Sequence, residues 1–561
     1  MQHAALTVKR RRRARCPVPS LKLTLCRPQL RIPGMAGDNG KSPVVLSDWF
    51  LCRDRIATSV SVVFFVMIMQ RLLAMVRGIV VARVLGPEQY GIYTLGMFIV
   101  PLAATIASLG TQGAYGRYAS RYESQGMLTQ SLRRIYTLTL VIAVIFAAIM
   151  IGLAPQVSSL LYRQPGLTWV IVAVAATIPA YLLIRNLAST FMGLKLFRAG
   201  AFPEFLQNVL YLAIGIPLAL VLRTALAGVL GYAIATYASV AVFSILLVRY
   251  VSRQEPVPRQ STEPGFYRHL LSFSIWYVVT PCLTLVFHYV DRLTLQHLRG
   301  SYDQGVYSAA VNVGETVSAF GLAVITVIYP HVSATWERGD REEARARLDL
   351  TMRIVGVLVL VLGLLVILFA KWLILLLLGS QYVPGTVALP YLVVYYILTV
   401  IVGILGIYPT LIERTYVTAI ALGITLPINI VFNRLLIPYL GMAGAALATM
   451  LAYSLMWIIV AFICRAYGWH QSKRATLVSL LPFVLLVPDL IRRALERLGP
   501  AYSAHRALAV VPDTVAIAAV AAVIYVCARR PWIISPAERN LAYAELKLVL
   551  AKARNFALRR R

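Results

Sequence analysis

Long apolar stretches separated by short polar loops fill most of this 561-residue chain. A helix needs about 20 mainly apolar residues to cross the hydrocarbon core of a membrane. Because unpaired backbone groups cannot face lipid, such stretches should be helical. About fourteen qualify, near 56–82, 92–114, 132–154, 168–189, 204–222, 226–249, 270–298, 305–330, 351–378, 388–411, 415–437, 441–465, 474–491 and 507–528. The pattern therefore predicts an all-α polytopic membrane protein with about 14 transmembrane helices.

The composition agrees with a membrane location. Apolar residues make up 59% of the chain and charged residues 14%, whereas soluble domains carry about 25% charged residues. The 54 Lys and Arg outnumber the 22 Asp and Glu. In a soluble protein this excess would indicate nucleic acid, but the cytoplasmic loops of membrane proteins also collect basic residues. We therefore expect no nucleic-acid partner. The six cysteines form no C-x-x-C pair, so we expect no metal site and no cofactor.

Basic residues gather in alternate loops. If the N-terminus is cytoplasmic, the loops after the second, fourth, sixth and eighth spans are cytoplasmic, and they contain Arg133, Lys195, Arg259 and Arg345 among others. The opposite loops mostly hold one basic residue each, with the loop 492–506 as the exception. This asymmetry predicts a multi-pass protein of the cell membrane with both termini in the cytoplasm.

The residues before the first span include the basic run from Lys9 to Arg15 and lack the apolar stretch of a secretory signal. Two interpretations stay open. Residues 1–55 form a disordered basic arm, or translation begins at Met35 and most of the arm is not part of the protein.

An internal repeat appears at one fixed offset, which carries Gly86 onto Gly300. Its two copies are Gly86-Pro-Glu-Gln-Tyr-Gly91-Ile-Tyr93 and Gly300-Ser-Tyr-Asp-Gln-Gly305-Val-Tyr307. Both copies join one span to the next on the outer side, and the same offset relates Glu123 to Glu337. Six spans separate the copies, so membrane orientation is preserved and the halves should be parallel repeats about an axis along the membrane normal.

The repeat divides the chain into five parts. We expect a basic arm (1–55), an N-lobe of spans 1–6 (56–250), a C-lobe of spans 7–12 (270–465), two added spans (474–528) and a basic cytoplasmic tail (529–561).

The four glycines of the repeat are expected to be structural. Glycine adopts positive φ and allows close backbone approach. We therefore predict tight turns between helices at Gly86, Gly91, Gly300 and Gly305. The tyrosine that follows each second glycine is expected to anchor its helix at the membrane interface.

Three motifs resemble one known family. They are Val81-Ala-Arg-Val-Leu-Gly-Pro-Glu-Gln-Tyr-Gly-Ile-Tyr93, Asp291-Arg-Leu-Thr-Leu-Gln-His-Leu-Arg-Gly300 with Gly305-Val-Tyr-Ser-Ala-Ala310, and Asn429-Ile-Val-Phe-Asn433 with Gly441-Met-Ala-Gly444. In this order they resemble the signatures of the polysaccharide biosynthesis or oligosaccharide-lipid flippase family, over roughly residues 55–465. That family belongs to the multidrug/oligosaccharidyl-lipid/polysaccharide exporter superfamily. The basic arm and the Arg-rich tail lie outside the resemblance.

The resemblance implies a fold and a function. Two six-helix lobes would surround a central cavity that opens alternately to each side of the membrane. The substrate would be a polyprenyl-linked oligosaccharide, moved from the cytoplasmic to the outer leaflet for polysaccharide biosynthesis. Membrane lipids would surround the protein, and proton or sodium coupling is left open.

Charged residues inside the predicted spans are the candidate site. A charge near the bilayer centre is costly and normally faces a cavity or a partner. The candidates are Arg71, Arg77, Asp291, Arg292 and Glu315. The arginines could bind a substrate diphosphate, because the planar guanidinium can contact phosphate oxygens bidentately. Asp291 or Glu315 could take part in proton or cation coupling.

Arg77 and Asp291 are related by the same offset as the two glycine motifs. Each lies nine residues before its turn, or about 13 Å along a helix. We predict that the two charges meet across the cavity. The alternative is that each pairs within its own lobe or extends to an interface.

Other functions compete with flippase activity. A drug or cation antiporter, or a flippase for a lipid-linked peptidoglycan precursor, would share the architecture. The sequence has no GxxxxGK[ST] loop, which argues against an ATP-driven pump. A membrane glycosyltransferase or glycan polymerase should have a large extramembrane loop with catalytic carboxylates, and no loop here is long enough. We therefore expect a transporter and not an enzyme.

Overall fold

The computed structural model describes residues 50, 56–108, 128–164, 166–253 and 276–490, and these residues form helices joined by short loops. The first half contains α2 (Ile56–Ala107), α4 (Leu128–Gly152), α5 (Ala154–Tyr162), α6 (Thr168–Gly193), α7 (Phe197–Leu210), η1 (Tyr211–Gly215), α8 (Ile216–Leu222) and α9 (Ala225–Ser252). The second half contains α11 (Trp276–Arg299), α12 (Ser301–Glu337), α13 (Arg341–Leu368), α14 (Ala370–Leu377), η2 (Ser380–Ala388), α15 (Leu389–Leu405), α16 (Ile407–Leu411), α17 (Tyr416–Ala466), α18 (Lys473–Leu480) and η3 (Leu481–Leu486).

Nine continuous helical stretches in the described residues are long and apolar enough to cross a membrane. Two of them, α2 and α17, each contain two crossings, because non-helical glycines at Gly86 and Gly441 reverse the chain. Helix α11 is not among the nine, since residues such as Asp291 and Arg292 lower its hydropathy. Together these helices account for the first twelve predicted spans. The thirteenth begins in α18, and the fourteenth, 507–528, lies outside the described residues, as do most of the N-terminal arm and all of the tail.

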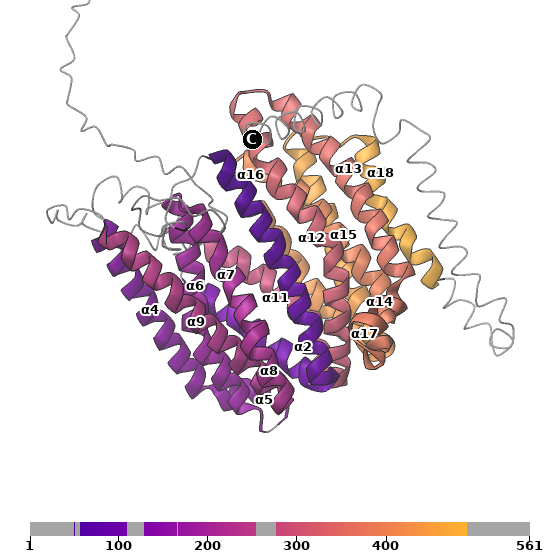
Figure 1. The fold of residues 1–561 in the computed structure, drawn as a ribbon. Coiled ribbons are helices and arrows are strands. Elements are labelled where there is room, and N and C mark those ends of the chain that lie inside the picture. The colour runs from indigo at the N-terminus through magenta and orange to yellow at the C-terminus, as the bar shows by residue number, and fades with distance from the viewer. Residues whose placement is uncertain (1–49, 51–55, 109–127, 165, 254–275, 491–561) are drawn as a thin grey trace, which may run out of the picture.

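The helices form two groups, with α2 running between them (Figure 1). In the first group α6 packs on α4 and α9, and α2 packs on α6 and α7. In the second group α17 packs on α11 and α15, and α12 packs on α13 and α15. The two groups meet mainly through α2 and α12. The expected all-α architecture of two lobes is therefore confirmed.

The first glycine of each repeat forms the predicted turn. Gly86 has φ 72° and Gly300 has φ 90°. These angles lie in the left-handed region, where a side chain is strained and glycine is not. Each glycine joins two spans at the same end of the molecule.

The second glycine of each repeat has a different role. Gly91 and Gly305 lie inside α2 and α12 and face each other where the lobes meet. A Cβ atom added to Gly305 would lie 1.8 Å from the carbonyl oxygen of Pro87, and one added to Gly91 would lie 2.2 Å from the carbonyl oxygen of Ser301. The absence of side chains at both positions therefore allows the two backbones to touch. The prediction of a turn at Gly91 and Gly305 is wrong, because what these positions require is close approach and not positive φ.

Hydrogen bonds surround this glycine contact. The Thr94 hydroxyl lies 3.4 Å from that of Ser308, its equivalent in the other lobe. Gln304 Nε2 donates to Thr94 Oγ1 at 3.1 Å and to Ser308 Oγ at 3.0 Å. The tyrosines that follow the second glycines, Tyr93 and Tyr307, are buried in the protein. The interfacial position expected for both tyrosines is therefore wrong.

Candidate functional site

Arg77 is bonded inside the first lobe. Its Nη1 donates to Asn208 Oδ1 of α7 at 3.0 Å. Its guanidinium carbon lies 5.7 Å from the ring centroid of Tyr211 and 5.3 Å from that of Tyr232. All three partners are neutral, and no carboxylate lies within ion-pair distance among the described residues. Arg77 is thus a cation at membrane depth held by an amide and two aromatic rings.

Glu204 of α7 lies at the centre of a second group of hydrogen-bonded polar side chains. It accepts hydrogen bonds from Gln70 of α2 and from Arg185 of α6, the latter at 3.1 Å. Asn208 connects the two groups, because its Nδ2 donates to the Glu204 carbonyl oxygen at 2.9 Å. Neither Arg185 nor Glu204 is among the candidate residues predicted from the sequence. The signal was available, since both charges lie within predicted spans.

Arg71 and Glu315 form an ion pair between the two lobes, with Nη1 and Oε1 3.7 Å apart. Arg71 precedes Gly86 by the same number of positions as Glu315 follows Gly300. Both are therefore about 22 Å along a helix from equivalent turns, which places them at similar depth. Their side chains are 62% and 47% exposed, so the pair borders open space and not packed protein.

Asp291 is buried in the second lobe, at 4% exposure. Its carboxylate accepts hydrogen bonds from the Tyr307 hydroxyl at 2.6 Å, the Thr449 hydroxyl at 3.3 Å and the Arg292 backbone N–H at 2.7 Å. These contacts tie α11 to α12 and α17. No cationic side chain lies within ion-pair distance of Asp291 in the described part of the chain.

Arg292 is also buried, with its guanidinium carbon 4.4 Å from the ring centroid of Tyr289. Its Nε has no hydrogen-bond partner among the described residues. The Tyr289 ring stacks on Phe98 of the other lobe, with centroids 4.2 Å apart. Arg292 therefore lies next to the contact between the lobes, with the Tyr289 ring against its guanidinium and Asp291 beyond ion-pair distance.

The predicted pairing of Arg77 with Asp291 is wrong. Each residue is bonded to partners of its own lobe, Arg77 to Asn208 and Asp291 to Tyr307 and Thr449. The repeat places the two residues at the same depth, but it does not fix the direction in which each side chain points. The alternative kept open from the sequence, pairing within each lobe, agrees with these contacts.

Comparisons with known proteins fit this arrangement. The family described as "Polysaccharide biosynthesis protein" matches residues 80–387, which is more than half of the chain. This chain belongs to the polysaccharide biosynthesis protein family. The family match includes Asp291, Arg292 and Glu315, whereas Arg71 and Arg77 lie just before it.

An uncharacterized membrane protein of Methanocaldococcus jannaschii is 24% identical over 261 residues, which cover 45% of this chain and 52% of the relative. The match thus spans about half the length of that relative. Among solved structures, the lipid II flippase MurJ in an inward closed conformation has a TM-score of 0.62 and 15% identity, over 82% of this chain and 98% of MurJ. An inward-facing multidrug resistance MATE family transporter has a TM-score of 0.57 and 17% identity, over 73% and 95%. These likenesses show that this member of the polysaccharide biosynthesis protein family has the fold of flippases and transporters.

Proposed function

We propose that the protein is a flippase that moves a polyprenyl-diphosphate-linked oligosaccharide across the cell membrane by alternating access. The observation that carries the proposal is a pair of guanidinium groups, Arg77 and Arg292, one in each lobe. Neither has a carboxylate within ion-pair distance among the described residues, although Asp291 acts on Arg292 from farther away, and a cation removed from water without a directly paired counter-charge is costly. A diphosphate supplies that charge and suits the planar fork of arginine.

The contacts between the lobes support a state that faces the cytoplasm. The described residues form hydrogen bonds between the lobes near the turns at Gly86 and Gly300, either in the adjoining halves of α2 and α12 or in the segments next to these halves. The ion pair of Arg71 with Glu315 lies farther from the turns. Tyr382 donates to the Ala82 carbonyl oxygen at 2.5 Å, and His297 Nε2 lies 2.7 Å from the Leu160 carbonyl oxygen. With a cytoplasmic N-terminus, the closed end is the outer one. Substrate would then enter on the side of Arg71 and Glu315.

Asp291 is the carboxylate that we assign to ion coupling. It is buried and forms no ion pair in the described part of the chain, and Thr449 of α17 donates to it. Asn433 and Thr449 each lie eight residues from the turn at Gly441, so they share one depth. The Oδ1 atom of Asn433 is buried without a hydrogen-bond partner among the described residues. Carboxylate, amide and hydroxyl oxygens are suitable ligands for a hard cation, and the carboxylate alone would serve for a proton.

The charges of the cluster separate this proposal from its rivals. A cavity for a cationic drug should present unpaired carboxylates. Here Glu204 bonds Arg185, and Glu315 pairs with Arg71, whereas Arg77 has no carboxylate partner among the residues described. Asp291 forms no ion pair there either, but it is buried and accepts hydrogen bonds, so it is not presented to a cavity. An anionic substrate is therefore favoured. The lipid-linked peptidoglycan precursor stays a second anionic candidate, because the likeness to MurJ is a likeness of fold.

Reconstitution tests the proposal. Liposomes with the purified chain would receive a fluorescent polyprenyl-diphosphate oligosaccharide, and an impermeant glycosidase would report the fraction that reaches the outer leaflet. We expect faster translocation than in empty liposomes and a loss of at least tenfold in Arg77→Gln and Arg292→Gln. Arg249→Gln, at the exposed end of α9, is the matched control and should keep the full rate. Translocation equal to empty liposomes, or normal rates in both site variants, would refute the proposal.

A further inference from the structure

A pocket of about 750 Å³ lies where α13 meets the connection between α17 and α18, away from the cluster of charged residues described above, which comprises Arg71, Arg77, Arg185, Glu204, Asp291, Arg292 and Glu315. Its volume is within the usual range for small-molecule sites. It shares no residue with the cluster described above. The lining residues are Glu342, Arg345, Ala346, Asp349, Arg353, Gly468, Trp469, His470, Ser472, Lys473 and Arg474.

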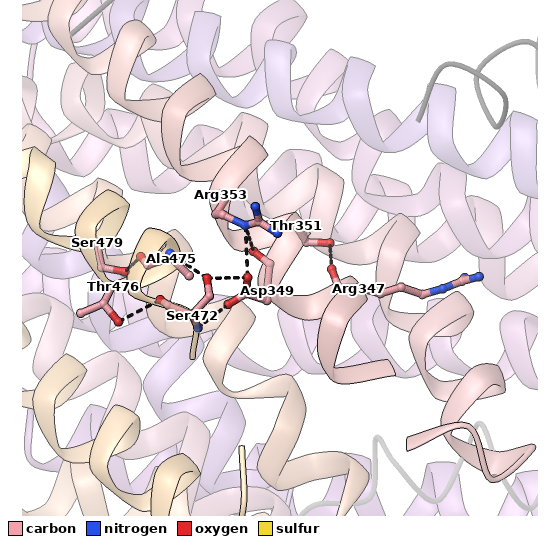
Figure 2. Close-up of polar contacts among 8 residues, drawn as sticks. All are labelled: Arg347, Asp349, Thr351, Arg353, Ser472, Ala475, Thr476 and Ser479. Carbon is pink, nitrogen blue, oxygen red and sulfur yellow. Dashed lines mark hydrogen bonds and ion pairs between the residues drawn. The ribbon is translucent and has the colours of Figure 1, made fainter. Parts of the chain in front are cut away.

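The two carboxylates of the pocket are already paired. Asp349 accepts from the Ser472 backbone N–H at 2.9 Å and from the Ser472 hydroxyl at 2.7 Å, and Arg353 Nε lies 3.1 Å from its Oδ2 (Figure 2). Glu342 lies 2.6 Å from Arg345 Nη1. Asp349 of α13 therefore accepts both hydrogen bonds from Ser472, the N-cap residue of α18, and arginines neutralise both acidic residues of the lining.

Positive charge is left over. The lining holds four permanent cations, namely Arg345, Arg353, Lys473 and Arg474, against two carboxylates. Lys473 and Arg474 are exposed and form no side-chain hydrogen bond or ion pair with the described residues. In addition, Arg345 Nε is buried without a hydrogen-bond partner in the described part of the chain. The pocket is thus equipped for an anion that the described part of the chain does not supply.

The pocket lies where charged sequence gives way to apolar sequence. In α13 the charges end at Arg353 and an apolar run starts at Ile354, and in α18 they end at Arg474. On the C-terminal side of this boundary, α13 exposes Ile354 and Leu358, and α18 exposes Leu477 and Leu480. Large apolar side chains exposed along a membrane-spanning helix contact lipid. The pocket is therefore at headgroup level, directly above surfaces suited to acyl chains.

We propose that this pocket binds the phosphate-bearing headgroup of an anionic phospholipid. Basic pockets between spans on the cytoplasmic side are a known arrangement for such headgroups. The phosphate would contact Lys473 and Arg474, and the acyl chains would lie along the exposed faces of α13 and α18. A soluble phosphate compound would share the headgroup contact but would gain nothing from the apolar surfaces below it.

Native mass spectrometry of the purified full chain in detergent tests the proposal. The probes are dioleoyl phosphatidylglycerol, dioleoyl phosphatidylcholine and glycerol phosphate. We expect one phosphatidylglycerol bound more tightly than phosphatidylcholine, and no competition from glycerol phosphate at the same concentration. The double variant Lys473→Gln, Arg474→Gln should bind phosphatidylglycerol roughly 30-fold more weakly, about fivefold per charge. Both side chains are exposed, so the fold should be retained, and thermal unfolding without lipid would verify this.

A matched variant controls for general charge attraction. The double variant Arg133→Gln, Arg249→Gln removes the same amount of charge from exposed positions, one near the N-terminus of α4 and one near the C-terminus of α9. The affinity of this variant for phosphatidylglycerol should be unchanged. Equal losses of phosphatidylglycerol affinity in both double variants would contradict the assignment of this pocket as the binding site. Competition by glycerol phosphate as effective as that by the lipid would overturn the lipid assignment. Neither result bears on translocation by Arg77 and Arg292, so this proposal and the flippase proposal can fail separately.

Discussion

Replacement of Gly305 by alanine should force the two lobes apart at the turn end, which is the end of the molecule that contains the turns at Gly86 and Gly300. The new Cβ would lie 1.8 Å from the Pro87 carbonyl oxygen and 2.9 Å from the Gly91 nitrogen. Real Cβ contacts essentially never fall below 3.0 Å, so the backbones must separate until the 1.8 Å contact reaches at least that distance. Backbone atoms cannot rotate away as a side chain can. Overpacking of this kind costs about 1–3 kcal/mol.

This cost applies to the state in which the turn end is closed. A penalty of about 2 kcal/mol would shift the equilibrium between closed and open outer ends about 30-fold toward the open form. The assay is reaction of an impermeant maleimide, added outside, with a cysteine introduced at Thr94 in a background without the native cysteines. We expect faster labelling in Gly305→Ala. Gly423→Ala is the control, because that helical glycine has no neighbour within 4 Å of a new Cβ. Equal labelling and equal thermal stability in the two variants would refute the reasoning.

Three substitutions elsewhere test the turn and the ion pairs. Gly300→Ala should lower the free energy of unfolding by about 1–2 kcal/mol, since φ 90° strains a side chain, as denaturant unfolding in detergent would show. Glu204→Gln should cost about 1 kcal/mol in the same assay, because the Arg185 partner is partly exposed, and no change would mean that the pair does not stabilise the fold. Asp349→Ala should cost about 3–5 kcal/mol, because it removes the carboxylate that pairs with the buried Arg353, and a loss below about 1 kcal/mol would contradict the buried pair.

The depth of a charged residue in the membrane could be predicted from the sequence better than the direction in which its side chain points. Arg71 and Glu315 lie at equal distances from their turns, a relation that was not used to predict a contact, and the structure brings them together. The repeat placed Arg77 and Asp291 at one depth, yet these point to partners in their own lobes. Hydropathy and repeat offset report position along the membrane normal. The rotation of each helix depends on packing, which neither signal contains.

The glycine motif shows the same limit. Positive φ at Gly86 and Gly300 follows from the need to reverse the chain within a few residues, and it was predicted. The contact of Gly91 with Gly305 requires knowledge that α2 and α12 cross at this point, which pattern and composition do not give. Similarly, Arg185 and Glu204 could be recognised as charges within spans, but the contacts of Glu204 with Arg185 and with Gln70 of α2 depend on how α6 and α7 fold back.

The contact between Gly91 and Gly305 has a consequence for the history of the chain. A residue can touch its own equivalent only on the axis that relates the two halves, which is the geometry of an isologous dimer. In such a dimer of identical six-span subunits, one substitution at this glycine would introduce two methyl groups into the same space. In a fused chain each copy can change alone. The pairs around the axis already differ, with Thr94 facing Ser308 and Tyr90 equivalent to Gln304. Fusion therefore lets one lobe diverge while the point of contact stays free of side chains.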